Sequence, residues 1–147
     1  MGKLNLDELM NKLKDTKSDE GFVAVASEAL AENNGKIDVE LSTKIEALLE
    51  EVIDGFKNNR TFNWRVHILD PIYAIVSITK LVDNTQDREA TEKLVDELLK
   101  DLFKRYSPKL PYIPDFIGNF IKSMILSSLI PKVVDWLFDK IYGPDKD

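Results

Sequence analysis

Apolar residues recur every three or four positions along most of the chain, a spacing that places them on one face of an α-helix. Residues that tolerate helix ends separate these stretches, such as the Asn33-Asn34-Gly35 tripeptide and the proline-containing segment 107–111. The pattern predicts helices over 4–13, 19–33, 38–58, 70–84, 85–106, 114–130 and 131–142. We therefore expect an all-α fold, an irregular multi-helix bundle of about six to seven helices.

Side chains that can accept the first free backbone N–H groups mark two of the helix starts. Ser18 or Asp19 can cap the second helix. The third helix begins at Asp38 or at Thr43, where Glu46 completes the spacing of a capping box. These residues are expected to fix where the two helices begin.

The segment Phe62–Leu69 departs from the helical pattern, because its apolar and polar residues alternate with a period of two. A lone strand needs a partner, and no second strand or hairpin turn is evident elsewhere in the sequence. We expect an extended segment or a helical turn here. Asp70 then precedes Pro71, whose missing N–H costs nothing at the first helical position, so Asp70 is the expected N-cap of the next helix.

The C-terminal third, residues 112–142, is the most apolar part of the chain, and Lys122 is the only charged residue between Phe116 and Ile130. Its apolar residues form one stripe before Pro131 and another after it: Ile117, Phe120, Ile121, Met124, Ile125 and Leu129, then Val133, Val134, Leu137, Phe138 and Ile141. We expect a core helix pair that divides or kinks at Pro131. Each piece is shorter than the roughly 18 to 20 residues that span a bilayer.

Composition limits the architecture and the location. The 147 residues suit a single domain over 1–147, with a peripheral N-terminal helix within 1–17 and a charged tail at 143–147. The absence of cysteine excludes thiol catalysis and thiolate metal sites. A net charge of −6 disfavours a nucleic-acid partner, since a phosphate backbone would be repelled. The N-terminus lacks the apolar run of a secretory signal, so we expect a cytoplasmic protein.

Few residues in the sequence could support catalysis or bind a cofactor. His67 is the only histidine, which leaves too few ligands for zinc, haem or copper, and no glycine-rich phosphate loop is present. A structural role is expected for His67. We therefore expect no catalytic residue, no metal site and no cofactor.

Carboxylates supply the one alternative enzymatic reading. Glu46, Glu50 and Asp54 recur every four residues along one helical face and could hold magnesium beside a phosphate compound. The spacing of Glu51 and Asp54 resembles the carboxylate helices of the all-α nucleotide pyrophosphatases. The second E-x-x-E-type motif of that family is missing, so the chain is not assigned to it. A magnesium-dependent hydrolase of a phosphate compound stays open as an alternative.

We expect instead a non-enzymatic module that binds another protein or itself, with an acidic inhibitor or immunity-type protein as a narrower version. The candidate contacts are aromatic residues of the last helix and carboxylates of the third: Trp136, Tyr142, Phe138, Glu46, Glu50 and Asp54. Trp136 lies off the apolar stripe of its helix. A third possibility is a peripheral membrane or apolar-ligand-binding protein that uses the C-terminal amphipathic helices.

Overall fold

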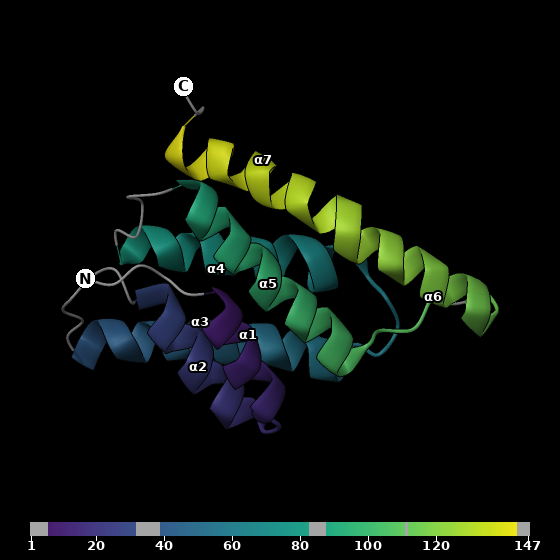
Figure 1. Ribbon diagram of the computed structural model, residues 1–147, viewed down its shortest axis with the longest axis horizontal. Coiled ribbons are helices and arrows are strands. Elements are labelled where there is room, and N and C mark those ends of the chain that lie inside the picture. The colour runs from purple at the N-terminus through teal and green to yellow at the C-terminus, as the bar shows by residue number, and fades with distance from the viewer. Residues whose placement is uncertain (1–5, 32–38, 83–87, 111, 144–147) are drawn as a thin grey trace.

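The computed structural model describes residues 6–31, 39–82, 88–110 and 112–143, and it confirms the all-α fold (Figure 1). The α-helices are α1 (Leu6–Asp15), α2 (Asp19–Ala31), α3 (Val39–Asn58), α4 (Asp70–Leu81), α5 (Arg88–Tyr106), α6 (Asp115–Met124) and α7 (Ile130–Tyr142). Two π-helical segments, η2 (Arg65–Leu69) and η3 (Ile125–Leu129), lead directly into α4 and α7. α6, η3 and α7 therefore form one continuous helix of 28 residues.

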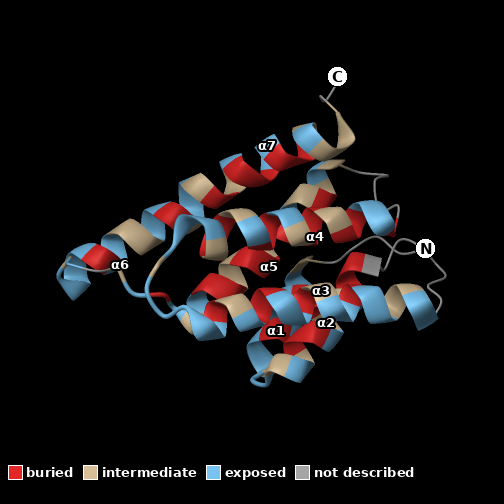
Figure 2. Cartoon of the chain, turned by 180° about the vertical axis from the view of Figure 1, so that it is seen from behind, coloured by how far each residue is buried: buried red, intermediate tan, exposed pale blue. Residues whose placement is uncertain are grey.

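The core is centred on α4, which packs against α3, α5 and α7. A helix in this position is apolar around most of its circumference. Six of its twelve residues are buried: Pro71, Ile72, Ile75, Val76, Ile78 and Thr79. Figure 2 shows the buried residues of α3, α5 and α7 on the faces turned toward this centre. Only the α7 half of the C-terminal helix belongs to the core, whereas α6 has a single buried residue, Gly118.

The expected cap of α2 is present, whereas those expected at Thr43 and Asp70 are not. The Ser18 hydroxyl accepts a hydrogen bond from the Gly21 N–H at 2.9 Å, as its position before α2 predicts. The capping box at Thr43 is wrong, because Thr43 lies inside α3 and donates to the carbonyl of Val39. Asp38, the other candidate start, lies outside the described residues.

Asp70 is also not an N-cap, since its backbone is already helical and continues from η2. Asn63 takes that role one turn earlier, where its side-chain oxygen accepts the N–H groups of Arg65 and Val66 at 3.0 and 3.1 Å. The alternating pattern of 62–69 is therefore mostly a helical turn. Just before it, Thr61 forms a single β-bridge with Lys109, and the N–H of Phe62 donates to the Lys109 carbonyl at 2.6 Å.

Both π segments end two residues before a proline, Pro71 in one case and Pro131 in the other. Each contains a wide turn, in which the N–H of Asp70 bonds the carbonyl of Arg65 and the N–H of Ile130 bonds that of Ile125. Proline lacks an N–H and crowds the carbonyl four residues earlier, so a wider turn lets the helix continue through it. This is why Pro131 does not divide the C-terminal helix.

α7 is fastened to α5 through Arg88. The guanidinium lies 2.6 Å from Glu92 in its own helix, 2.6 Å from Asp139 and 3.2 Å from Asp135. These contacts are partly shielded from solvent, which strengthens charge-assisted hydrogen bonds. The carboxylates of α7 are thereby turned toward the body of the protein.

Candidate interaction surface

α6 projects beyond the body of the molecule, as both views show (Figures 1 and 2). Apart from η3, which continues it, α6 rests on the loop that precedes it. A Cβ atom at Gly118 would lie 3.8 Å from the Leu110 side chain, and Lys122 donates to the Ser107 hydroxyl at 3.0 Å. One narrow face of α6 is therefore covered, and the opposite face is open to solvent.

The open face carries large apolar side chains. Phe116, Phe120 and Met124 have exposed fractions of 77%, 65% and 52%, and Ile117 beside them is exposed as well. Their spacing of four residues places Phe116, Phe120 and Met124 in one row along the helix. We call these four residues the α6 ridge. Exposed apolar residues grouped in this way are typical of interaction sites.

The row continues through Ser128 in η3 and Lys132, Trp136 and Lys140 in α7, all of them exposed. Trp136 is 50% exposed, and the ammonium of Lys140 lies 5.5 Å from the centre of its ring. Neither Lys132 nor Lys140 has an ion-pair partner among the described residues, because Asp135 and Asp139 bind Arg88 instead. A cavity of about 360 Å³ lies where the two halves of the row meet, between Met124 and Lys132.

The helix from Asp115 to Tyr142 is long and apolar enough to cross a membrane by length and composition, unlike the two short pieces expected from the sequence. Only 28% of its most apolar 18-residue window is buried within the protein. A core helix of the same composition also passes a length and composition test, so this finding alone identifies no membrane segment.

The three aromatic candidates from the sequence lie in different surroundings. Trp136 is on the surface. Phe138 is buried beneath the guanidinium of Arg88, and Tyr142 is half-buried and stacked on Phe138 with ring centres 5.4 Å apart. The hydroxyl of Tyr142 lies 2.8 Å from that of Thr79. Phe138 and Tyr142 therefore hold α7 in place, and Trp136 alone of the three is available to a partner.

The carboxylate candidates lie on the outer face of α3. Glu46, Glu50 and Asp54 are exposed and have no ion-pair partner among the described residues. Within the same described ranges, no group of three or more carboxylate or histidine side chains could hold a metal ion. The structure thus presents these residues as an acidic surface.

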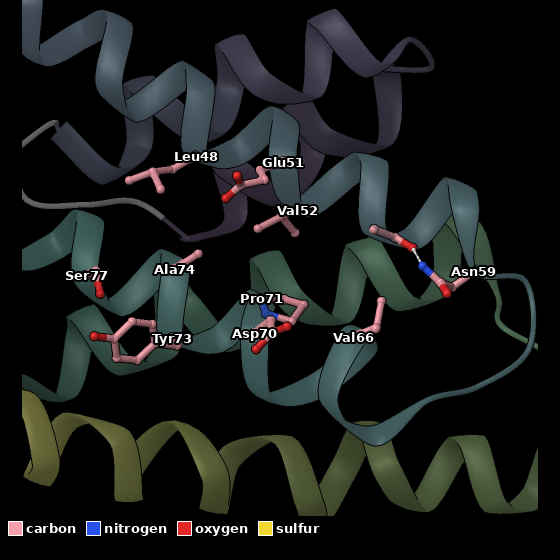
Figure 3. Close-up of a pocket in the computed structure, with 11 residues that line it drawn as sticks. Leu48, Glu51, Val52, Asn59, Val66, Asp70, Pro71, Tyr73, Ala74 and Ser77 are labelled. Atoms are coloured by element: carbon pink, nitrogen blue, oxygen red, sulfur yellow. Dashed lines mark hydrogen bonds between the residues drawn. The ribbon is translucent and has the colours of Figure 1, made fainter.

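A groove of about 530 Å³ opens between α3 and α4, next to this acidic surface (Figure 3). Apolar side chains of Leu48, Val52, Val66, Pro71 and Ala74 line much of it. Glu51 stands on the α3 side and Asp70 on the α4 side. We call this the α3–α4 groove.

η2 lies next to Gly55 at one end of the groove, where a Cβ atom on Gly55 would be in ordinary van der Waals contact with Val66 at 3.4 Å. His67 lies behind this wall and is fully buried, between the rings of Phe56 and Phe62. Burial lowers the pKa of its imidazole, so the neutral form is favoured. Both ring nitrogens bond backbone groups, which fits the structural role expected for His67.

Sequence reasoning did not select Phe116, Phe120 or Met124 as contacts, and it assigned the last two to the core. The rule that the large apolar face of a helix packs inward predicts the opposite of what α6 does. Its covered face holds Gly118 and Lys122, and its bulky face is open. A glycine in the middle of an otherwise bulky helix is the available signal, since it permits close contact on that side.

A scan against protein-family models found no match to this chain, and comparisons with curated proteins and with solved structures found none either.

Proposed function

We propose that this protein is a non-enzymatic interaction module that binds another protein through the α6 ridge. The observation that carries this proposal is the exposure of Phe116, Phe120 and Met124 on a helix that projects from the body. Covering a large apolar side chain contributes about 1.5 to 3 kcal/mol. A partner that covers all three therefore gains enough to offset part of the cost of association.

The mode of binding that fits is the insertion of a helix face into an apolar groove. Such recognition uses anchors three, four and seven or eight residues apart along one helix. Phe116, Phe120 and Met124 meet this spacing on an exposed helix that is already folded. Binding of α6 would thus avoid the entropy cost of ordering a disordered peptide.

Charge defines the partner further. The segment 108–132 contains three lysines, Lys109, Lys122 and Lys132, and a single carboxylate, Asp115, in a chain whose net charge is −6. A partner with carboxylates around its groove would be attracted to this part of the surface and repelled by the rest.

Site-specific photo-crosslinking in the native host tests the proposal. A photoreactive residue at position 120 is expected to form a crosslink to one defined protein, and the same residue in place of Trp64 serves as an exposed control on η2's flank. Adding Phe116→Ser to the protein with the photoreactive residue at position 120 should abolish the crosslink. Its stability should change by less than about 0.5 kcal/mol, because Phe116 is a surface residue. Equal crosslinking at positions 120 and 64 would contradict the proposal.

A second candidate function, attachment to a membrane surface, is favoured by the row that joins the α6 ridge to Lys132, Trp136 and Lys140. Phenylalanine and tryptophan facing outward beside lysines are typical of helices that lie in the bilayer interface. In a Trp64→Phe protein, Trp136 is the only tryptophan, and binding to vesicles should shift its fluorescence to shorter wavelength. An unchanged spectrum with both anionic and zwitterionic vesicles would rule this function out.

A further inference from the structure

We propose that the α6 ridge binds the α3–α4 groove of a second copy of this chain, so that copies assemble head to tail. This inference rests on the proposed function and names the partner. The ridge is a protruding apolar feature and the groove a recessed one, and they lie on different elements.

The two surfaces are both apolar, and the groove has the volume of a typical binding site. The groove has a volume of about 530 Å³, within the range of roughly 300 to 1,000 Å³ typical of sites that enclose an apolar ligand. Val52, Pro71 and Ala74 lie along it and would contact the rings of Phe116 and Phe120. Bulky aromatic anchors entering a pocket are the usual centre of a protein interface.

The charges of the two surfaces are opposite. The segment 108–132, which contains the α6 ridge, carries Lys109, Lys122 and Lys132 against one carboxylate, Asp115, and Lys132 lines the cavity beside Met124. Glu51 and Asp70, in contrast, stand on the two sides of the groove. Asp70 has a long contact of 3.9 Å with Arg65, and Glu51 has no ion-pair partner among the described residues. The outer face of α3 beside the groove is acidic as well. Pairing of ridge with groove brings this basic segment to the acidic sides of the groove, while pairing of two ridges would bring two basic segments together.

One chain cannot make this contact within itself. α6 contacts η3 and the loop at 107–110, and it has no extensive contact with α3 or α4. The interface is therefore heterologous, with the ridge of one copy in the groove of the next. Each added copy leaves one ridge and one groove unoccupied, so growth continues unless a ring closes.

Light scattering of two variants, alone and mixed, tests the inference. The ridge variant is Phe116→Ser/Phe120→Ser. The groove variant is Ala74→Arg. Its long side chain at this half-buried position should fill the groove and place a cation near Glu51. The wild type should give species larger than a dimer as its concentration rises. Each variant alone should associate at least about tenfold more weakly, a change of about 1.4 kcal/mol.

The mixture is the decisive sample, because the ridge variant keeps an intact groove and the groove variant keeps an intact ridge. An equal mixture should form dimers and nothing larger. Self-association by the groove variant alone would show that ridges pair with each other and would overturn the inference. A wild type that stays monomeric would overturn it too, while a crosslink from position 120 to a different protein would still support the proposed function.

Because the chain has no cysteine, single introduced cysteines can test the contact by disulfide formation while the ridge and the groove both stay intact. One protein carries Ser123→Cys on α6 and another carries Ser77→Cys at the groove. Oxidation of the mixture should yield a mixed disulfide dimer more than tenfold faster than either protein alone forms one. A protein with Glu28→Cys, at an exposed position on α2, is the matched control. Equal rates for all pairs would contradict ridge-to-groove contact.

Discussion

The Nε2 atom of His67 lies 2.8 Å from the carbonyl oxygen of Asn59, so the imidazole ties the segment after α3 to η2. The other ring nitrogen, Nδ1, lies 2.9 Å from the N–H of Asn63. Because that N–H can only donate, Nδ1 must accept, and the proton of the neutral ring belongs to Nε2. The buried ring thus supports one end of the α3–α4 groove in its neutral form.

The free energy of unfolding should therefore decrease as the pH falls below about 6.5. Burial lowers the folded-state pKa of His67 beneath the ordinary value, so below that value the unfolded chain binds a proton that the folded chain does not. The loss should begin near pH 6.5 and continue down to the lowered pKa. Urea unfolding at pH 7.5, 6.5 and 5.5 measures it.

His67→Gln is the control for this pH dependence, since His67 is the only histidine. Burial raises the pKa values of Glu92 and Asp96, and this effect, which has the opposite sign, is present in both proteins. The difference between wild type and variant isolates His67. The same slope in both proteins would show that the imidazole is not the source.

Tyr142→Phe should lower the free energy of unfolding by about 0.5 to 1.5 kcal/mol, the usual net contribution of one hydrogen bond. Thr79 donates its hydroxyl proton to the Val76 carbonyl at 2.6 Å, so Tyr142 is the donor in the contact between the two hydroxyls. A cycle with Thr79→Val should give a coupling energy of the same size. Additive effects would mean that the two side chains act separately.

Arg88→Ala should destabilise the protein by about 1.5 to 3 kcal/mol, because it removes charge-assisted hydrogen bonds between α5 and α7. Arg88→Lys should recover only part of this, since one ammonium cannot reproduce the forked contacts with Glu92 and Asp139. Chemical denaturation compares the variants. Glu89→Ala, which removes the exposed partner of Lys93, is the control and should cost less than about 0.5 kcal/mol. An equal loss in the control would place the effect outside the Arg88 contacts.

Deleting Ser127 together with Pro131→Ala should leave the fold intact, with a loss below about 2 kcal/mol. A π turn holds one residue more than an α turn, so the deletion turns η3 into ordinary helix while both flanking helices keep their orientation. Deleting Asp135 within α7 would instead rotate the residues after it by about 100°.

That rotation should move Phe138 out of the core, and the Asp135 deletion should then cost more than about 3 kcal/mol. Thermal unfolding followed by circular dichroism distinguishes the two deletions. Similar melting temperatures for both would contradict the view of η3 as a one-residue insertion.

Much of the fold follows from the sequence because it depends on local geometry. On α5, oppositely charged side chains four residues apart form ion pairs, with distances of 3.9 Å for Glu89 and Lys93 and 3.0 Å for Asp96 and Lys100. Helical geometry alone brings such residues together. Asp101 and Arg105 form a further pair of this kind at 2.8 Å.

The exposure of the α6 ridge did not follow from the sequence, because it depends on where neighbouring helices end. The stripe containing Phe120 and Met124 has the pattern of a core helix, and nothing local shows that the body stops short of α6. The continuity of the helix at Pro131 was also not predicted. A proline predicts an interruption, whereas the wide turn beginning at Ile125 carries the helix through it.

The unbroken helix from α6 to α7 also has a mechanical consequence. At about 1.5 Å per residue, Phe116 stands roughly 20 Å along the axis from Ile130, where contact with the body becomes continuous. A load on the free end therefore acts with leverage on the anchored end. The contacts of Arg88 with α7, and that of Tyr142 with Thr79, would carry the resulting torque.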